Sequence, residues 1–351
     1  NIISHNFAVA IKYRFEMISL KLTQRMKLNF LSISLFAFLL TACSLSETKK
    51  DNQIDPRIKN EIHTLNKRIV DGLVENKIQN ILPICSDRLR DRKGEVKRLM
   101  QLVKSSIKKS DFRILNEYYQ KNAAKKGVAT LSSGMGNIHD YQIRYDSRNK
   151  EMYVVVAYFQ DSLYQKSFTF FYGKDNNEWK LTNLQAGALK IMHKDAVDWY
   201  MQAKSEYQQG YLIDAMCHIG LATQILNPVN HMWKYAKEKE IQSFEQKVTK
   251  ETYSKYNFPH AVDYVETKPV IYRVYSQIIP EGCLPLIQYT TSIDLKNVPA
   301  LAAECKAMHE KIGQLFKGID KNNKTIIYRP LKNAPTGTDT DNKYVFMMPT
   351  K

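Results

Sequence analysis

The run Met152-Tyr153-Val154-Val155-Val156-Ala157-Tyr158-Phe159 decides how this chain folds. Apart from its methionine and its alanine, every residue in it is β-branched or aromatic, a composition that favours a β-strand. Polar turn sequences at 146–149 and 173–177 separate strand-like runs of this kind. Similar runs lie at 112–115, 141–145, 167–172 and 179–184. Strands separated by short turns predict an antiparallel sheet.

Helical spacing precedes these strands. Apolar residues recur every three or four positions from Ile58 to Leu73 and again from Val96 to Ile107. Residues 57–190 therefore predict an α+β domain in which helices pack on a curved antiparallel sheet. This element order resembles the nuclear transport factor two-like and cystatin-like folds, a group that includes enzymes as well as binding modules. The resemblance implies a cone-like domain with a concave sheet face, and it does not choose between catalysis and binding.

The next predicted domain, 191–250, contains a stretch at 195–228 that resembles one tetratricopeptide unit. Such a unit is a helical hairpin with large residues on its first helix, a glycine at the turn and small residues where the helices cross. The matching residues are Trp199, Tyr200, Ala203, Tyr207, Gly210, Ala215, Ala222 and Pro228. A second unit shifted by one repeat would lack the turn glycine and the small residues, so 230–250 predicts a single capping helix. A lone hairpin either packs the domains together or receives a partner.

Residues 258–351 predict a small C-terminal α+β domain. Strand-like runs lie at 270–277, 286–293, 325–329 and 344–348, and a helix is expected at 299–316. The order of these elements predicts a ββαββ layer.

The N-terminal part resembles the signal of a bacterial lipoprotein. Met26-Lys27 precedes an apolar stretch at 28–40, and Leu40-Thr41-Ala42-Cys43 has the order of a lipobox. The resemblance implies that residues 1–42 are removed and that Cys43 is lipidated. Residues 43–56 would then be a flexible tether, with the protein held on the outer membrane and facing the periplasm. An ordinary cleaved signal peptide is the alternative.

Four further cysteines, Cys85, Cys217, Cys283 and Cys305, lack a CxxC spacing. Export to an oxidising compartment would allow a disulfide, and Cys283 with Cys305 is the one pair that falls within a single predicted domain. The alternative is that all four are buried as small apolar residues.

The chain has a net charge of +17, and without residues 1–42 the charge is still +13. Basic residues gather at 104–109 and 121–126 without interleaved aromatic residues, so no nucleic-acid partner is expected. A basic face in the cell envelope would attract anionic lipid head groups or other acidic polymers, or would simply be solvated.

Motifs for catalysis and for metal or cofactor binding are missing from the sequence. His309-Glu310 has no second histidine four positions on, and no GxSxG or Walker A sequence occurs, so neither metal nor cofactor is expected. Two functions therefore remain open. The first is an envelope lipoprotein with a non-catalytic binding or scaffolding role. The second is a small-pocket enzyme that uses His139, Asp140 and Tyr141 beside the concave sheet of 57–190.

Overall fold

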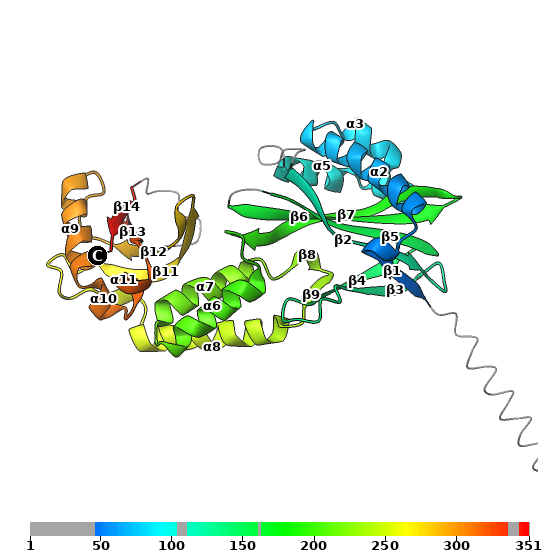
Figure 1. Ribbon diagram of the computed structural model, residues 1–351. Helices are drawn as coiled ribbons and strands as arrows, with labels where there is room; N and C mark the ends of the chain where they lie inside the picture. The colour runs from blue at the N-terminus through cyan, green and yellow to red at the C-terminus, as the bar shows by residue number, and fades with distance from the viewer. Residues whose placement is uncertain (1–45, 104–110, 161–162, 336–343, 351) are drawn as a thin grey trace, which may run out of the picture. The chain divides into compact units, whose positions relative to one another are not determined.

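The β-branched and aromatic runs form the central sheet of an α+β structure. The computed structural model describes residues 46–103, 111–160, 163–335 and 344–350. In this sheet the strand order is β1-β2-β5-β6-β7, and β2, β5, β6 and β7 pair with antiparallel neighbours (Figure 1). The bounds are β1 (Glu47–Lys50), β2 (Phe112–Lys121), β5 (Glu151–Phe159), β6 (Tyr164–Asp175) and β7 (Glu178–Ile191).

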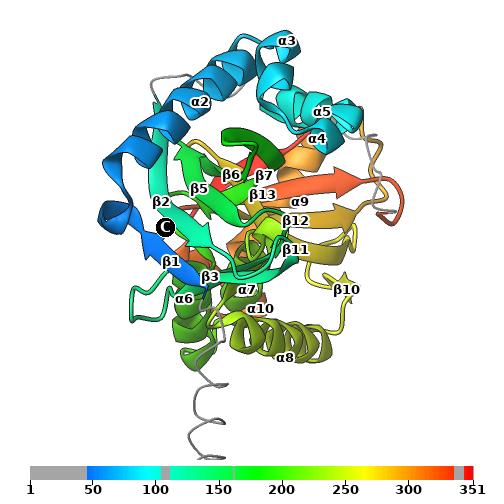
Figure 2. The same cartoon turned by 90° about the vertical axis from the view of Figure 1, so that its right-hand side faces the viewer.

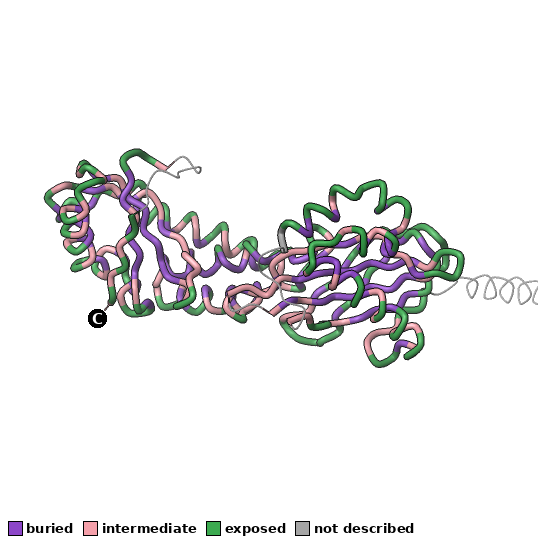
Figure 3. Tube along the Cα trace, turned by 90° about the horizontal axis from the view of Figure 1, so that it is seen from above, coloured by how far each residue is buried: buried purple, intermediate pink, exposed green. Residues whose placement is uncertain are grey.

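Both faces of the central sheet are buried, because alternate side chains of a strand point to opposite faces. Alternate residues of β5 from Tyr153 onward share a core with the N-terminal helices, and those from Met152 onward share a second core with a smaller sheet and the helical hairpin. Figures 2 and 3 show the helices covering one face and the strands largely buried. The helices are α2 (Pro56–Val74), α3 (Ile78–Ile81), α4 (Asp87–Asp91) and α5 (Lys93–Val103). Side chains therefore pack against both faces of the central sheet.

The smaller sheet corrects the prediction of a single curved sheet. It consists of β3 (Gly127–Ser132), β4 (Tyr141–Ser147) and β9 (Trp233–Tyr235), in the order β3-β4-β9. The prediction of a capping helix over 230–250 is wrong at its start, because Trp233 lies in β9 and stacks on Tyr141 with ring centroids 3.7 Å apart. The helix in this region, α8, runs over Glu238–Tyr256 instead. β3 was not predicted.

The helical hairpin has the expected two helices, α6 (Ala196–Gln208) and α7 (Leu212–Gln224). Gly210 joins them with a φ of +76°, a conformation that glycine adopts without strain. Ala215 and Ala222 of α7 contribute to the core beneath the central sheet, whereas Leu212 and Cys217 contribute to the core of the C-terminal layer. The predicted boundary at 190/191 therefore runs through a shared core.

The C-terminal layer is a five-stranded sheet in the order β10-β11-β12-β13-β14. It corrects the predicted ββαββ layer, because the two-residue strand β10 pairs with β11 and adds a third strand before the helices. Between β12 and β13, which are parallel, the chain crosses over through helices, as a parallel connection requires. The bounds are β10 (His260–Ala261), β11 (Val270–Ile279), β12 (Gly282–Thr290), α9 (Val298–Glu310), α10 (Ile312–Leu315), α11 (Ile319–Asn322), β13 (Thr325–Leu331) and β14 (Phe346–Pro349).

The segment expected to be a flexible tether is ordered from its middle onward. Asp51 accepts a hydrogen bond of 2.8 Å from the backbone N–H of Glu117 in β2, and Ile54 is buried in the core under α2. Asp55 caps α2 by accepting the N–H of Arg57, and Pro56 occupies the first turn, where its missing N–H is not needed. The tether prediction is therefore wrong for residues 50–56, because these contacts fix the chain.

Candidate functional site

The predicted lipidation motif, Leu40, Thr41, Ala42 and Cys43, lies outside the described residues. Within the part of the chain that the structure describes, no helix combines the length and the apolar character needed to cross a membrane.

The residues of the helical hairpin build its interior. Trp199, Ala203, Ala215 and Ala222 are almost fully buried, and the indole N–H of Trp199 donates to the carbonyl of Ile191. The other predicted members are also placed: Tyr200 is buried, Tyr207 is partly buried, Gly210 forms the turn and Pro228 opens β8 (Pro228–His231). Pro228 thus begins a strand, whereas it was expected to end the hairpin. The buried residues of the helical hairpin thus pack in the core that the hairpin shares with the central sheet.

The four cysteines of the described chain are free thiols. Burial raises the pKa of Cys85 and of Cys283 to about 11, and that of Cys305 to about 12. Burial also raises the pKa of Cys217. Because the thiolate is the reactive form, these thiols are poor nucleophiles at neutral pH.

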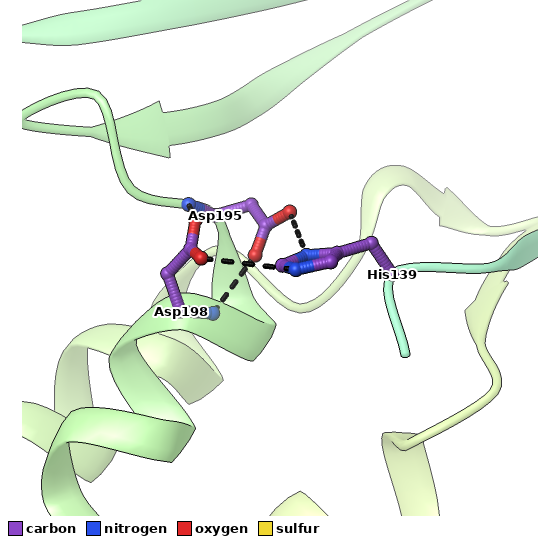
Figure 4. Close-up of side chains that lie close together, drawn as sticks. All are labelled: His139, Asp195 and Asp198. Carbon is purple, nitrogen blue, oxygen red and sulfur yellow. Dashed lines mark hydrogen bonds and ion pairs between the residues drawn. The ribbon is translucent and has the colours of Figure 1, made fainter. Parts of the chain in front are cut away.

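His139 lies where the connection between β3 and β4 meets the first turn of α6 (Figure 4). Its Nδ1 is 2.8 Å from Asp195 Oδ2, and its Nε2 is 3.9 Å from Asp198 Oδ1. Asp195 is also the N-cap of α6, and Asp198 closes the capping box by accepting the N–H of Asp195. The three side chains therefore link a loop to a helix start.

The other two nominal catalytic residues point elsewhere. Asp140 accepts hydrogen bonds from the Ser133 hydroxyl and from the N–H groups of Met135 and Gly136, which hold the pKa of this carboxyl below its ordinary value. Tyr141 of β4 is buried and its hydroxyl donates to Asn116 Oδ1 of β2, and burial raises its pKa well above the ordinary value. The structure thus separates the three neighbours His139, Asp140 and Tyr141 and does not bring them to one reactive point.

The side chains of His139, Asp195 and Asp198 could together bind a divalent metal ion. Their ligand atoms lie within 4.8 Å of one another, and one imidazole with two carboxylates suits an ion such as Zn²⁺. Each carboxylate, however, already places one oxygen on a backbone N–H at the start of α6. These hydrogen bonds account for the three side chains without a metal, because they tie the loop of His139 to the start of α6.

A larger feature is a cleft of about 600 Å³ beside strand β7, here called the central cleft. Its floor is apolar and includes Met152 and Phe171, whereas its rim is cationic. The cationic rim residues are Arg88, Arg92, Arg144, Arg148 and Lys234. Thr182, Asn183 and Gln185 of β7 line the same space.

Local structure brings the arginines to this cleft from separate elements. Ser86 caps α4, and its N–H donates to the carbonyl of Leu181, which fixes α4 against β7 next to Arg88. In β4 the burial alternates, so Arg144 points outward while its N–H donates to the carbonyl of Met232. A bulge in β7 at Thr182, directly after Leu181, interrupts the pairing with β6.

Most cations of the rim have no partner among the residues that the structure describes. The side chains of Arg88, Arg144, Arg148 and Lys234 make no hydrogen bond or ion pair with any other described residue. Arg92, in contrast, pairs with Glu95. Two carboxylates, Glu95 and Asp146, also line the cleft, so cations exceed anions in it by five to two. A cleft with apolar walls and an excess of one sign of charge attracts counter-ions.

The sequence did not point to these residues. The basic runs singled out were 104–109, which lies outside the described residues, and 121–126, where Lys125 pairs with Asp175 at 3.5 Å. Arg88, Arg144 and Lys234 lie far apart in the sequence. The pairing of β4 with β9 brings Arg144 near Lys234, and the contact of α4 with β7 adds Arg88. The alternation of β4 is the one local signal, since it predicts that Arg144 is on the outer face.

No family model matches this chain, and neither the curated proteins nor the solved structures contain a significant match to it.

Proposed function

We propose that this chain is a lipid-anchored protein of a bacterial cell envelope with a non-catalytic binding role, and that the central cleft receives an anionic partner. The anchor would be Cys43, and the folded part would face the periplasm from the outer membrane. The central sheet with its helices, the helical hairpin and the C-terminal layer would together form the scaffold that carries the cleft.

The observation that supports this proposal is the unpaired charge of Arg88, Arg144, Arg148 and Lys234 around one cleft. Leaving several cations without carboxylate partners in one place costs stability through their mutual repulsion. An anion that enters the cleft relieves the repulsion, and a guanidinium binds a carboxylate or phosphate through two parallel hydrogen bonds. The apolar floor strengthens these contacts because it lowers the local dielectric constant.

The proposal is tested with the double variant Arg88→Ala/Arg144→Ala, assayed by titration calorimetry with galacturonate and with its polymer. Wild-type protein should bind, with an affinity that falls as salt is added. The double variant should bind at least about tenfold more weakly, since two charge-assisted contacts are lost.

The matched control is Arg68→Ala/Lys239→Ala, which removes two exposed cations that do not line the cleft. The control should bind as the wild type does. Equal losses in the two double variants would mean that only the net charge matters. A wild-type protein that binds neither probe nor anionic lipid vesicles would refute an anion-binding role.

A further inference from the structure

The central cleft continues into two neighbouring hollows. The first, here called the β6–β7 hollow, has a volume of about 410 Å³ and shares Arg88, Arg148 and Thr182 with the cleft. The second, here called the β8–β9 hollow, has a volume of about 390 Å³ and shares His231 and Lys234 with it. The shared residues make the three spaces neighbours, and together they are here called the groove. In the β6–β7 hollow the carboxylates of Asp87, Asp175 and Glu178 pair with Arg90, Lys125 and Lys180, so the excess positive charge of the groove lies in the central cleft.

Amide side chains connect the cleft to the β8–β9 hollow. Gln185 donates to Asn183 Oδ1 at 2.8 Å, and Asn230 donates to Gln185 Oε1 at 2.5 Å. This relay fixes the orientation of all three amides and leaves an N–H₂ group on Asn183 and a carbonyl oxygen on Asn230 to bind a ligand. Fixed donors and acceptors beside cations match a molecule that has both hydroxyl groups and negative charge.

The aromatic lining argues against nucleic acid. Tyr145, Phe171 and Trp233 reach the groove but are 4%, 1% and 1% exposed, so their ring faces lie in the core. Single-stranded nucleic acids bind by stacking bases on exposed rings. Among the described residues that line the groove, every Phe, Tyr and Trp ring is buried, and the one exposed ring is the small imidazole of His231.

We infer that the groove binds a linear acidic polysaccharide, whose acid groups contact the arginines and whose hydroxyl groups contact the amides. This inference rests on the proposed function and adds the class of ligand and its length. A small anion would occupy the central cleft alone, whereas a polysaccharide would extend from Asn176, at the end of the β6–β7 hollow, to Asn227, at the end of the β8–β9 hollow.

The two ends supply the test. Asn176→Asp and Asn227→Asp each place a negative charge at one end with almost no change in shape, and both asparagines are exposed. Asn257→Asp is the control, because Asn257 is exposed, shares the left-handed backbone of Asn176 and lines none of the three spaces. Each variant is titrated with galacturonate monomer, with a long oligogalacturonate and with polyglutamate.

The oligomer should bind wild-type protein more tightly than the monomer does. Each end variant should weaken oligomer binding about two- to fivefold, the size of one surface charge contact, and should leave monomer binding unchanged. Equal affinities for monomer and oligomer, or end variants without effect, would refute a polymeric ligand and would leave the proposed anion site intact. If polyglutamate bound as tightly as the oligogalacturonate, the inference that the ligand is a polysaccharide would be refuted. Failure of every probe on wild-type protein would refute both proposals.

Discussion

Replacing Ala215 by leucine should destabilise the protein clearly, because α7 has no space for a larger side chain at this position. Ala215 is fully buried in the core that α6, α7 and the central sheet share. Adding three carbon atoms there forces neighbouring side chains out of their rotamers or separates the helices, at a cost of about 1–3 kcal/mol. For a unit of this size, about 2 °C of melting temperature corresponds to 1 kcal/mol, so the midpoint should fall by about 2–6 °C.

The same helix provides the control. Gly220 is exposed on α7, and a Cβ added there would meet no atom within 4 Å. Gly220→Ala should therefore stabilise the helix by about 0.8–1.0 kcal/mol, since alanine loses less backbone entropy than glycine. Both variants are measured by thermal unfolding followed by circular dichroism. If Ala215→Leu left the midpoint unchanged while Gly220→Ala raised it, the close packing inferred for this face of α7 would be refuted.

Three further changes test other parts of the structure. Burial alone would raise the pKa of Glu117. Hydrogen bonds from His63, Lys59 and Tyr153 outweigh this effect, so the pKa lies below the ordinary 4.5. Its stabilisation is present above pH 4.5 and is lost as pH falls through the lower folded pKa. Glu117→Gln should lower the unfolding free energy by about 2 kcal/mol at pH 7 and should flatten its acid dependence in urea titrations. His139→Phe should cost about 1 kcal/mol in the same assay by removing the bond to Asp195, whereas a melting temperature that rises with added Zn²⁺ in wild-type protein alone would reveal a metal site there. Cys43→Ser should release the protein from membranes in cell fractionation and abolish acyl labelling, and a variant that stays membrane-bound with unchanged labelling would contradict the lipid anchor.

The sequence predicted the elements whose own residues determine their structure. The strand at 152–159 and the hairpin around Gly210 were found because β-branched runs and a glycine turn are local signals. β9 was assigned to a helix because its three residues become a strand only by pairing with β4, about 90 positions earlier. The rim of the central cleft was missed for the same reason, since its arginines meet only after the two sheets have formed.

The position of the central cleft follows from the way the edge of the central sheet is protected. β7 is the last strand of that sheet, and an open edge invites another strand to pair with it. Residues around Ser86 cover the edge at Leu181, and the bulge at Thr182 breaks the ladder immediately beyond. The helix layer and the smaller sheet flank this irregular edge and contribute Arg88 and Arg144 from opposite sides. A peptide that bound by adding a strand would meet the bulge, whereas a ligand held by side chains would not. The edge geometry therefore favours a polysaccharide over a peptide in the groove.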